Sequence, residues 1–203
     1  FLDVYRNGGL VPRGMSGGSY TFVMIGAGST GLFVSAAQRG IGGLDLEEVY
    51  TALEKNHLPG GLMSKSGYEH ETCVGGGIEY YIDRGYVPEG IEADGIHRDG
   101  AGMTLDYAYY DWCLAQLARK LGKREEYRLL MRRAQSYRNI YNPETGFMHP
   151  RGFDGNFTSD FDPFSEFGFC EANGWQSLWY VPHDVMGLAD LMGGAGVFIS
   201  RLD

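Results

Sequence analysis

The chain has 203 residues, of which 43% are hydrophobic and 14% aromatic, which is enough for the core of one domain or of part of a larger one. Its 26 acidic and 17 basic residues give a formal net charge of −9, which argues against nucleic acid as a partner. No apolar run reaches the length of about 18 residues that a membrane span needs, and the three widely spaced cysteines form neither a disulfide framework nor a metal-binding pair.

Glycine is unusually frequent in this chain. The sequence contains 32 glycines, well above the average usage of about 7%. Many of them lie beside aromatic residues in segments 8–18, 60–77 and 85–102. This composition predicts long, well-packed loops on a helical scaffold, and such loops often form binding sites.

The first motif along the chain is a glycine pattern over residues 26–31. It follows the apolar run Val23-Met24-Ile25 and precedes a helix predicted from about Ser29 to Gly40. The spacing G-x-G-x-x-G is typical of a dinucleotide-binding turn, but that turn requires a second strand and an acidic residue about 20 positions further on. Because residues 40–44 are too rich in glycine for such a strand, we favour close helix packing, with nucleotide binding as the alternative.

A second helix is predicted to begin at Asp45, where Asp45 and Glu48 form a capping pattern, and to end before Pro59. The loop after it contains Tyr68-Glu69-His70-Glu71, whose side chains are potential metal ligands. Adjacent side chains do not converge on one ion, and no partner residue has the spacing of a ligand. We therefore predict a polar loop there and no metal site in this chain.

Residues 103–121 have the strongest helical pattern. Both faces of this helix are apolar, which predicts deep burial. Its first half nevertheless contains Asp106 and Asp111, and a buried carboxylate needs partners or a water-filled cavity. Two interpretations remain open: this end of the helix borders a cleft, or the two acids complement the positive end of the helix.

The rest of the chain is predicted to be helical with one long loop. An amphipathic helix over 124–141 and a turn at 142–146 precede the aromatic-rich loop 147–170, and further helices follow near 173–180 and 183–192. No strand pair is convincing. About six helices, joined alternately by short and long connections, predict an all-α fold that is part of an α/α toroid with long glycine-rich loops.

Residues 170–184 contain the densest set of chemical groups in the chain. Glu171 lies there among large aromatic residues, including Trp175 and Trp179. We interpret this stretch as the lining of a sugar-binding cleft with Glu171 as a proton donor. The alternative is that the aromatic residues belong to the core and that Glu171 is solvated.

Motifs along the whole chain, in order, resemble the C-terminal catalytic domain of glycoside hydrolase family 92, the calcium-dependent exo-α-mannosidases. The chain departs from the family pattern at Asp106, where the family often has Glu, and after Gly26, where the family often has His or Asp. The motifs that carry the resemblance are Gly8–Pro12, Lys55–Gly61, Tyr80–Pro88, Thr104–Trp112, Asn142–Met148 and Val181–Gly194.

The resemblance implies a fold and a reaction. It implies an (α/α)6 barrel behind an N-terminal β-sandwich, with residues 1–203 as a part of the barrel that is truncated at both ends. The expected reaction is the removal of terminal α-linked mannose, with an α-1,2 linkage expected, from mannosides or N-glycans with inversion. Glu171 is the expected general acid, the general base lies outside this chain, and the isolated fragment is expected to be inactive.

The resemblance also implies partners. The expected cofactor is calcium, bound mainly by residues outside this chain, and the expected partners are a mannose-containing glycan and the rest of the same polypeptide. The expected location is secreted, periplasmic or on the surface of a bacterium. The alternative is a non-catalytic carbohydrate-binding or structural α/α module. The residues expected to bind substrate are Asp106, Trp112, Asn173, Trp175, Gln176 and His183.

Overall fold

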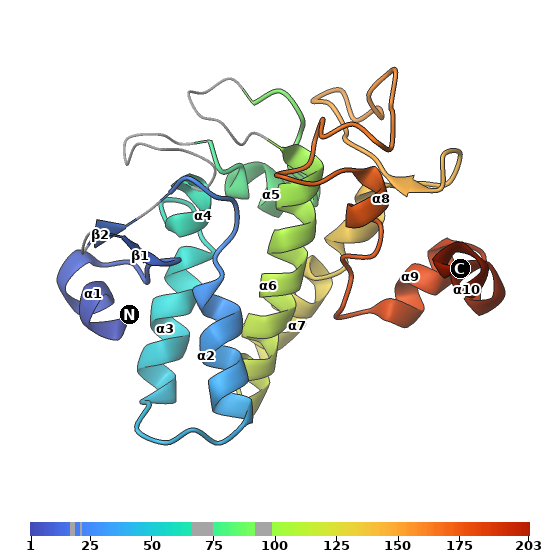
Figure 1. The fold of residues 1–203 in the computed structure, drawn as a ribbon. Coiled ribbons are helices and arrows are strands. Elements are labelled where there is room, and N and C mark those ends of the chain that lie inside the picture. The colour runs from blue at the N-terminus through green and yellow to red at the C-terminus, as the bar shows by residue number, and fades with distance from the viewer. Residues whose placement is uncertain (17–18, 21, 66–74, 92–98) are drawn as a thin grey trace.

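The computed structural model describes residues 1–16, 19–20, 22–65, 75–91 and 99–203. The quartet Tyr68-Glu69-His70-Glu71 lies outside these residues. Helices dominate the described part of the chain (Figure 1), so the all-α prediction is confirmed. In order, the elements are α1 (Leu2–Gly8), β1 (Met15–Ser16), β2 (Ser19–Tyr20), α2 (Ser29–Gln38), α3 (Leu46–Asn56), α4 (Leu62–Lys65), α5 (Ile78–Arg84), α6 (Gly100–Lys120), α7 (Arg124–Arg133), the 3₁₀ helix η1 (Ser136–Ile140), β3 (Tyr141–Asn142), β4 (Phe147–Met148), α8 (Gly174–Ser177), α9 (Val185–Leu191) and α10 (Ala195–Leu202).

Helix α6 is the centre of the fold. It packs against α2, α3, α7 and η1, and in Figure 1 it lies between the pair α2 and α3 on one side and α7 on the other. Side chains on several faces of α6 are fully buried, Leu105 and Leu114 among them. The two apolar stripes in the sequence predicted this central position, although the helix begins at Gly100, three residues earlier than predicted.

Several predicted boundaries are wrong. The helix predicted over 124–141 ends at Arg133, and a 3₁₀ helix follows in which Tyr137 and Ile140 are buried. The turn at 142–146 joins two short antiparallel strands, β3 and β4, and β1 pairs with β2 in the same way. Two-residue strands are too short to leave an alternating pattern in a sequence.

The last helices also differ from the prediction. Helix α8 covers only four residues. Helix α9 begins after Asp184, because the Asp184 carboxylate accepts a hydrogen bond from the backbone N–H of Gly187 at 3.0 Å and so caps the helix. Helix α10 was not predicted. Within the described residues no single helix has the length and hydrophobicity of a membrane span. Helices α9 and α10, which meet at 97°, have that length and hydrophobicity only when they are taken together.

A buried ionic network joins five helical segments at the middle of α6. The Asp111 carboxylate is completely buried. Its Oδ1 lies 2.9 Å from Nδ1 of His57, and its Oδ2 lies 2.7 Å from Nε of Arg133 and 3.1 Å from the hydroxyl of Tyr81. The network extends to α2, because Oγ1 of Thr30 lies 3.0 Å from Nε2 of His57. Asp111 is thus a structural residue of the core.

Candidate active site

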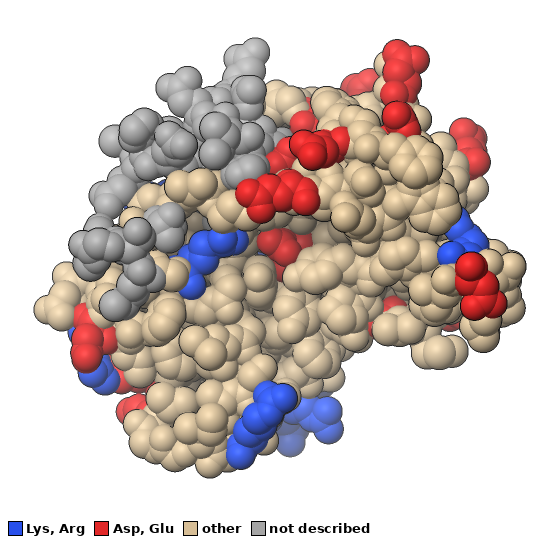
Figure 2. All heavy atoms as spheres, viewed as in Figure 1, with Lys and Arg blue, Asp and Glu red and all other residues tan. Residues whose placement is uncertain are grey.

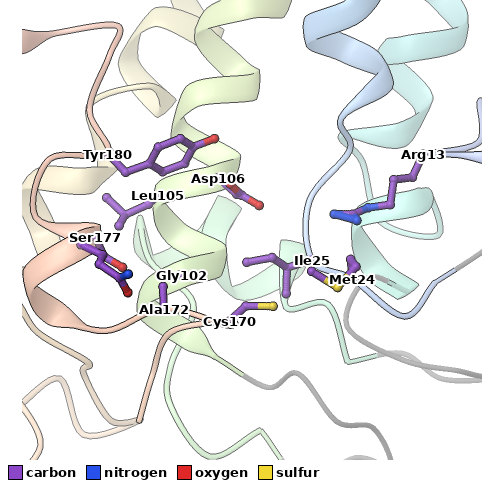
Figure 3. Close-up of a pocket in the computed structure, with 11 residues that line it drawn as sticks. Arg13, Met24, Ile25, Gly102, Leu105, Asp106, Cys170, Ala172, Ser177 and Tyr180 are labelled. Atoms are coloured by element: carbon purple, nitrogen blue, oxygen red, sulfur yellow. The ribbon is translucent and has the colours of Figure 1, made fainter. Parts of the chain in front are cut away.

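A cavity of about 330 Å³ opens beside the N-terminal half of α6. Three parts of the chain form its wall: Arg13 and the loop before α2, α6 itself, and the segment 170–180. Figure 3 shows Asp106 pointing into the cavity from α6 and Arg13 pointing in from the opposite side. The volume is within the range of roughly 300–1,000 Å³ that is usual for small-molecule sites. The cleft interpretation of Asp106 is therefore correct.

Gly168 brings the segment 170–172 to the cavity. Its φ of +86° favours glycine, and a Cβ there would lie 2.1 Å from Cγ of Pro150. In this conformation the carbonyl of Gly168 accepts a hydrogen bond from the N–H of Gly102 at 2.9 Å. The chain therefore crosses α6 one turn before Asp106, and Cys170 and Ala172 become part of the cavity wall.

Gly26 brings the opposite wall to α6. Its φ is +77°, and a Cβ there would lie 2.6 Å from Oδ2 of Asp106 and 2.7 Å from a ring carbon of Tyr110. Residues 22–28, which precede α2, form bends and not a strand. The glycine pattern thus serves close packing against α6, as we favoured, and the strand that a dinucleotide-binding turn requires is absent from residues 22–28.

The environment of Asp106 favours its protonated form. The side chain is half-buried, and burial raises the pKa of Asp106 to about 6, against the opposing effects of a hydrogen bond from Tyr180 and the positive charge of Arg13. Desolvation near Asp106 also raises the pKa of the Tyr110 phenol. A carboxyl with this pKa can hold and release a proton near neutral pH.

Glu171 lies at the edge of the cavity. The residues before and after it line the wall, whereas the Glu171 side chain is exposed. Its backbone has a φ of +51°, a left-handed conformation that is uncommon for glutamate. The predicted aromatic partners pack elsewhere: the Trp175 ring meets the Phe147 ring edge-on at 4.9 Å, and the Trp179 ring meets the Phe198 ring edge-on at 5.4 Å. The role of Glu171 as general acid stays a prediction.

Asn173 and Gln176 form a capping box at the start of α8. The side chain of Asn173 accepts a hydrogen bond from the N–H of Gln176 at 3.1 Å, and the side chain of Gln176 accepts one from the N–H of Asn173 at 3.1 Å. Of the two residues, Gln176 also lines the cavity. Both side chains therefore stabilise the backbone that forms this wall.

Trp112 and His183 belong to an aromatic cluster and do not line the cavity. The His183 ring meets the Tyr137 ring edge-on at 5.6 Å, and the centroids of the Trp112 and His183 rings are 6.4 Å apart. Burial lowers the pKa of His183, so the neutral imidazole donates from Nε2 to the Ala134 carbonyl at 2.9 Å. Contacts of these two residues with substrate remain predictions.

The two cavity residues that act on Asp106, Arg13 and Tyr180, were not among the site residues predicted from the sequence. Arg13 follows Pro12 in a glycine-rich loop, and Tyr180 is one of several aromatic residues in 170–184. Only the orientation of each side chain, toward the cavity, distinguishes these two residues from their neighbours. The periodicity of a regular helix could have given that direction, but neither residue lies in one.

The described residues do not fit a calcium site by themselves. Within residues 1–16, 19–20, 22–65, 75–91 and 99–203, no three His, Cys, Asp or Glu side chains lie close enough to share an ion. Asp106 faces Arg13 across the cavity and not a second carboxylate. Calcium binding by the whole protein therefore stays a proposal, with ligands from other parts of the polypeptide.

We expect Glu171→Gly to stabilise the protein. The left-handed conformation costs an L-residue about 1–2 kcal/mol, and the greater freedom of glycine in the unfolded chain offsets about 0.5–1 kcal/mol of the gain. Urea denaturation should therefore show a free energy of unfolding that is higher by roughly 0.5–1 kcal/mol. Asp160→Gly is the control, since Asp160 has a φ of +55° outside the cavity wall. A loss of stability at position 171 alone would show that the Glu171 side chain stabilises the fold.

Known proteins resemble this chain over its whole length. Residues 1–203 match the family described as the glycosyl hydrolase family 92 catalytic domain. The family GH92 inverting mannosidase BT2199 from Bacteroides thetaiotaomicron is 34% identical with a TM-score of 0.86, and the match covers 100% of this chain and 26% of that one. The GH92 alpha-mannosidase BT3965 from the same bacterium, solved in complex with mannoimidazole, is 29% identical with a TM-score of 0.78 over 96% of this chain and 24% of that one.

A curated relative comes from a fungus. It is an uncharacterized secreted glycosidase of Arthroderma benhamiae, 27% identical over 156 residues, which are 63% of this chain and 20% of the relative. The chain thus spans about a quarter or less of the length of the proteins that it matches.

Proposed function

The chain belongs to glycosyl hydrolase family 92, and we propose that the protein containing it removes α-linked mannose from mannosides or glycans with inversion of the anomeric carbon. The observation that supports this function best is the half-buried Asp106, which faces a cavity of suitable size and has a pKa of about 6. Two solved structures that resemble the chain are those of mannosidases, and one of these enzymes is described as inverting.

In this proposal Asp106 is the proton donor. An inverting glycosidase needs one carboxyl that is protonated near neutral pH and a second, ionised carboxylate roughly 6.5–9.5 Å away that activates water. Desolvation shifts Asp106 toward the first property, because it raises the pKa of this carboxyl to about 6. The sequence had suggested Glu171 for this role, and the Glu171 side chain is exposed at the edge of the cavity.

Glu171 takes a different part in the proposal. Its strained backbone at the rim is typical of residues whose side chain serves a site, so we assign the Glu171 carboxylate to hydrogen bonds with sugar hydroxyls. The general base and the calcium ligands come from parts of the polypeptide outside residues 1–203. The proposal also includes secretion, since the fungal relative is described as secreted.

The full-length protein should release mannose from α-1,2-mannobiose. Proton NMR during hydrolysis should detect β-mannose first, because inversion at an α-linkage yields the β-anomer. Initial formation of α-mannose would contradict inversion but would still show that the protein is a mannosidase. Binding of mannobiose without release of mannose would instead favour a non-catalytic carbohydrate-binding module.

A further inference from the structure

We propose that Arg13 is a sugar-binding residue of the cavity, whose guanidinium group donates hydrogen bonds to hydroxyl oxygens of an uncharged sugar. This inference rests on the proposed function, because it takes the cavity to be the site where the sugar binds. It adds a contact on the wall opposite α6, a wall for which the sequence had predicted no binding residue.

The backbone before Arg13 is firmly anchored. Val11 is completely buried, and its carbonyl accepts a hydrogen bond from the side-chain amide of Asn56, itself fully buried, at 2.8 Å. Pro12, also buried, restricts the backbone torsion just before Arg13. The guanidinium group therefore extends into the cavity from a fixed base, on the side opposite Asp106 (Figure 3). A ligand that binds Arg13 finds the backbone of this residue already in position, which limits the entropy lost on binding.

One donor of the Arg13 guanidinium group lacks an acceptor. Its Nε is buried and has no hydrogen-bond partner among the residues that the structure describes. Other half-buried arginines use the same atom or a terminal nitrogen: Nε of Arg138 donates to Gln135 at 2.7 Å, Nε of Arg151 donates to the Gly155 carbonyl at 2.9 Å, and Nη1 of Arg201 donates to the Gly146 carbonyl at 2.6 Å. A buried donor without an acceptor lowers stability, so a ligand that supplies oxygen atoms here is bound favourably.

The surroundings favour an uncharged ligand over an anion. Arg13 shares the cavity with the Asp106 carboxyl, and the whole chain has a net charge of −9. Figure 2 shows basic and acidic atoms beside a hollow near the middle of this face, with further acidic atoms along the edge above it. An anion would meet repulsion from the net negative charge of the chain and from the acidic side chains along this edge. A sugar with neighbouring hydroxyls offers two oxygens to the planar guanidinium fork without that penalty.

The test is the binding of methyl α-mannoside to the full-length protein, measured by calorimetry. A hydrogen bond from a charged group to a neutral oxygen that is lost on mutation weakens binding by roughly 10- to 100-fold, which is the effect expected for Arg13→Met. Arg13→Lys, which keeps one charged donor, should fall between this variant and the wild type. Arg39→Met is the matched control, because Arg39 is exposed at the end of α2, and it should bind as the wild type does.

Kinetics and a competitor complete the design. Arg13→Met should raise KM more than it lowers kcat, since the contact is present in ground and transition states alike, and its thermal unfolding midpoint identifies a folding defect. Wild-type affinity in both Arg13 variants would overturn the inference and leave the proposed function intact, provided that the wild type hydrolyses mannosides. Displacement of the sugar by inorganic phosphate at lower concentration than by mannose would overturn it in favour of an anion site. Failure of the wild type both to bind and to hydrolyse any mannoside would overturn both proposals.

Discussion

Asp106→Asn should lower the rate of hydrolysis of α-mannosides with poor leaving groups by roughly 10²- to 10⁴-fold, the usual contribution of a general acid. The amide keeps the size of the side chain and its contact with Gly26 but has no acidic proton to give. A mannoside with a good leaving group, such as 4-nitrophenyl α-mannoside, needs little protonation, so its rate should fall far less. The ratio of the two rates, measured with the purified full-length variant, tests the assignment.

The pH dependence of the rate tests the role of Asp106 as proton donor independently. Because burial raises the pKa of Asp106 to about 6, kcat/KM for a poor leaving group should fall in the wild type as the pH rises above about 6, where the proton is lost. This part of the profile should disappear in Asp106→Asn. Glu171→Gln is the comparison: if that variant, and not Asp106→Asn, loses the pH dependence and the activity, Glu171 is the proton donor as the sequence suggested.

Loss of activity in Asp106→Asn should not reflect unfolding. The proton is held more tightly by Asp106 in the folded chain than in the unfolded one, because the pKa rises from 3.8 to about 6 on folding. Ionisation of Asp106 therefore lowers stability as the pH rises through this interval. An asparagine cannot ionise, so the variant should be at least as stable as the wild type at pH 7, which urea denaturation can check.

Arg133→Met should destabilise the protein by about 3–5 kcal/mol, because it removes the cation beside a completely buried carboxylate. The Arg133 side chain is 11% exposed and that of Asp111 is 0% exposed, and the two are 2.7 Å apart. Without the guanidinium group, the partners of Asp111 that remain within the described residues are His57 and Tyr81. Urea denaturation at pH 7 measures the loss.

Arg128→Met is the matched control on the same helix. Arg128 lies 2.6 Å from Glu125, but both side chains are largely exposed, at 61% and 82%, and exposed pairs contribute at most about 1 kcal/mol. The double variant Asp111→Asn with Arg133→Met should regain part of the stability, since it leaves no buried charge unpaired. Equal effects of Arg133→Met and Arg128→Met would contradict the structural role assigned to the network.

The parts of the fold that follow from local pattern were predictable. The two apolar stripes of α6 and the N-cap at Asp45 each depend on spacing within one helix, and both are found in the structure. The Glu48 side chain, predicted to complete the cap, instead accepts hydrogen bonds from Arg6. Helix α10 was missed because it follows two glycines with positive φ, a pattern that is typical of the end of a helix. Its apolar residues Val197, Ile199 and Leu202 are exposed.

The site was predictable only in part, because its residues meet through contacts distant in sequence. Asp106 stood out as a carboxylate in an apolar helix, and the structure places it in the cavity. Asn173 and Gln176 stood out because amide side chains can bind sugars. In the structure the two side chains accept hydrogen bonds from backbone N–H groups at the start of α8. Arg13 did not stand out, since nothing in a glycine-rich loop reveals which charged side chain points toward a helix about 90 residues further along.

The close approach of Gly26 to Asp106 has a consequence for altering substrate range. With no room for a Cβ between its backbone and the carboxylate, position 26 is closed to variation in a mutant library. Its neighbours Met24 and Ile25, whose side chains line the cavity, can change in size without moving Asp106 directly. A library that keeps Gly26 and randomises positions 24 and 25 would reshape the cavity from the side opposite the proposed proton donor, Asp106.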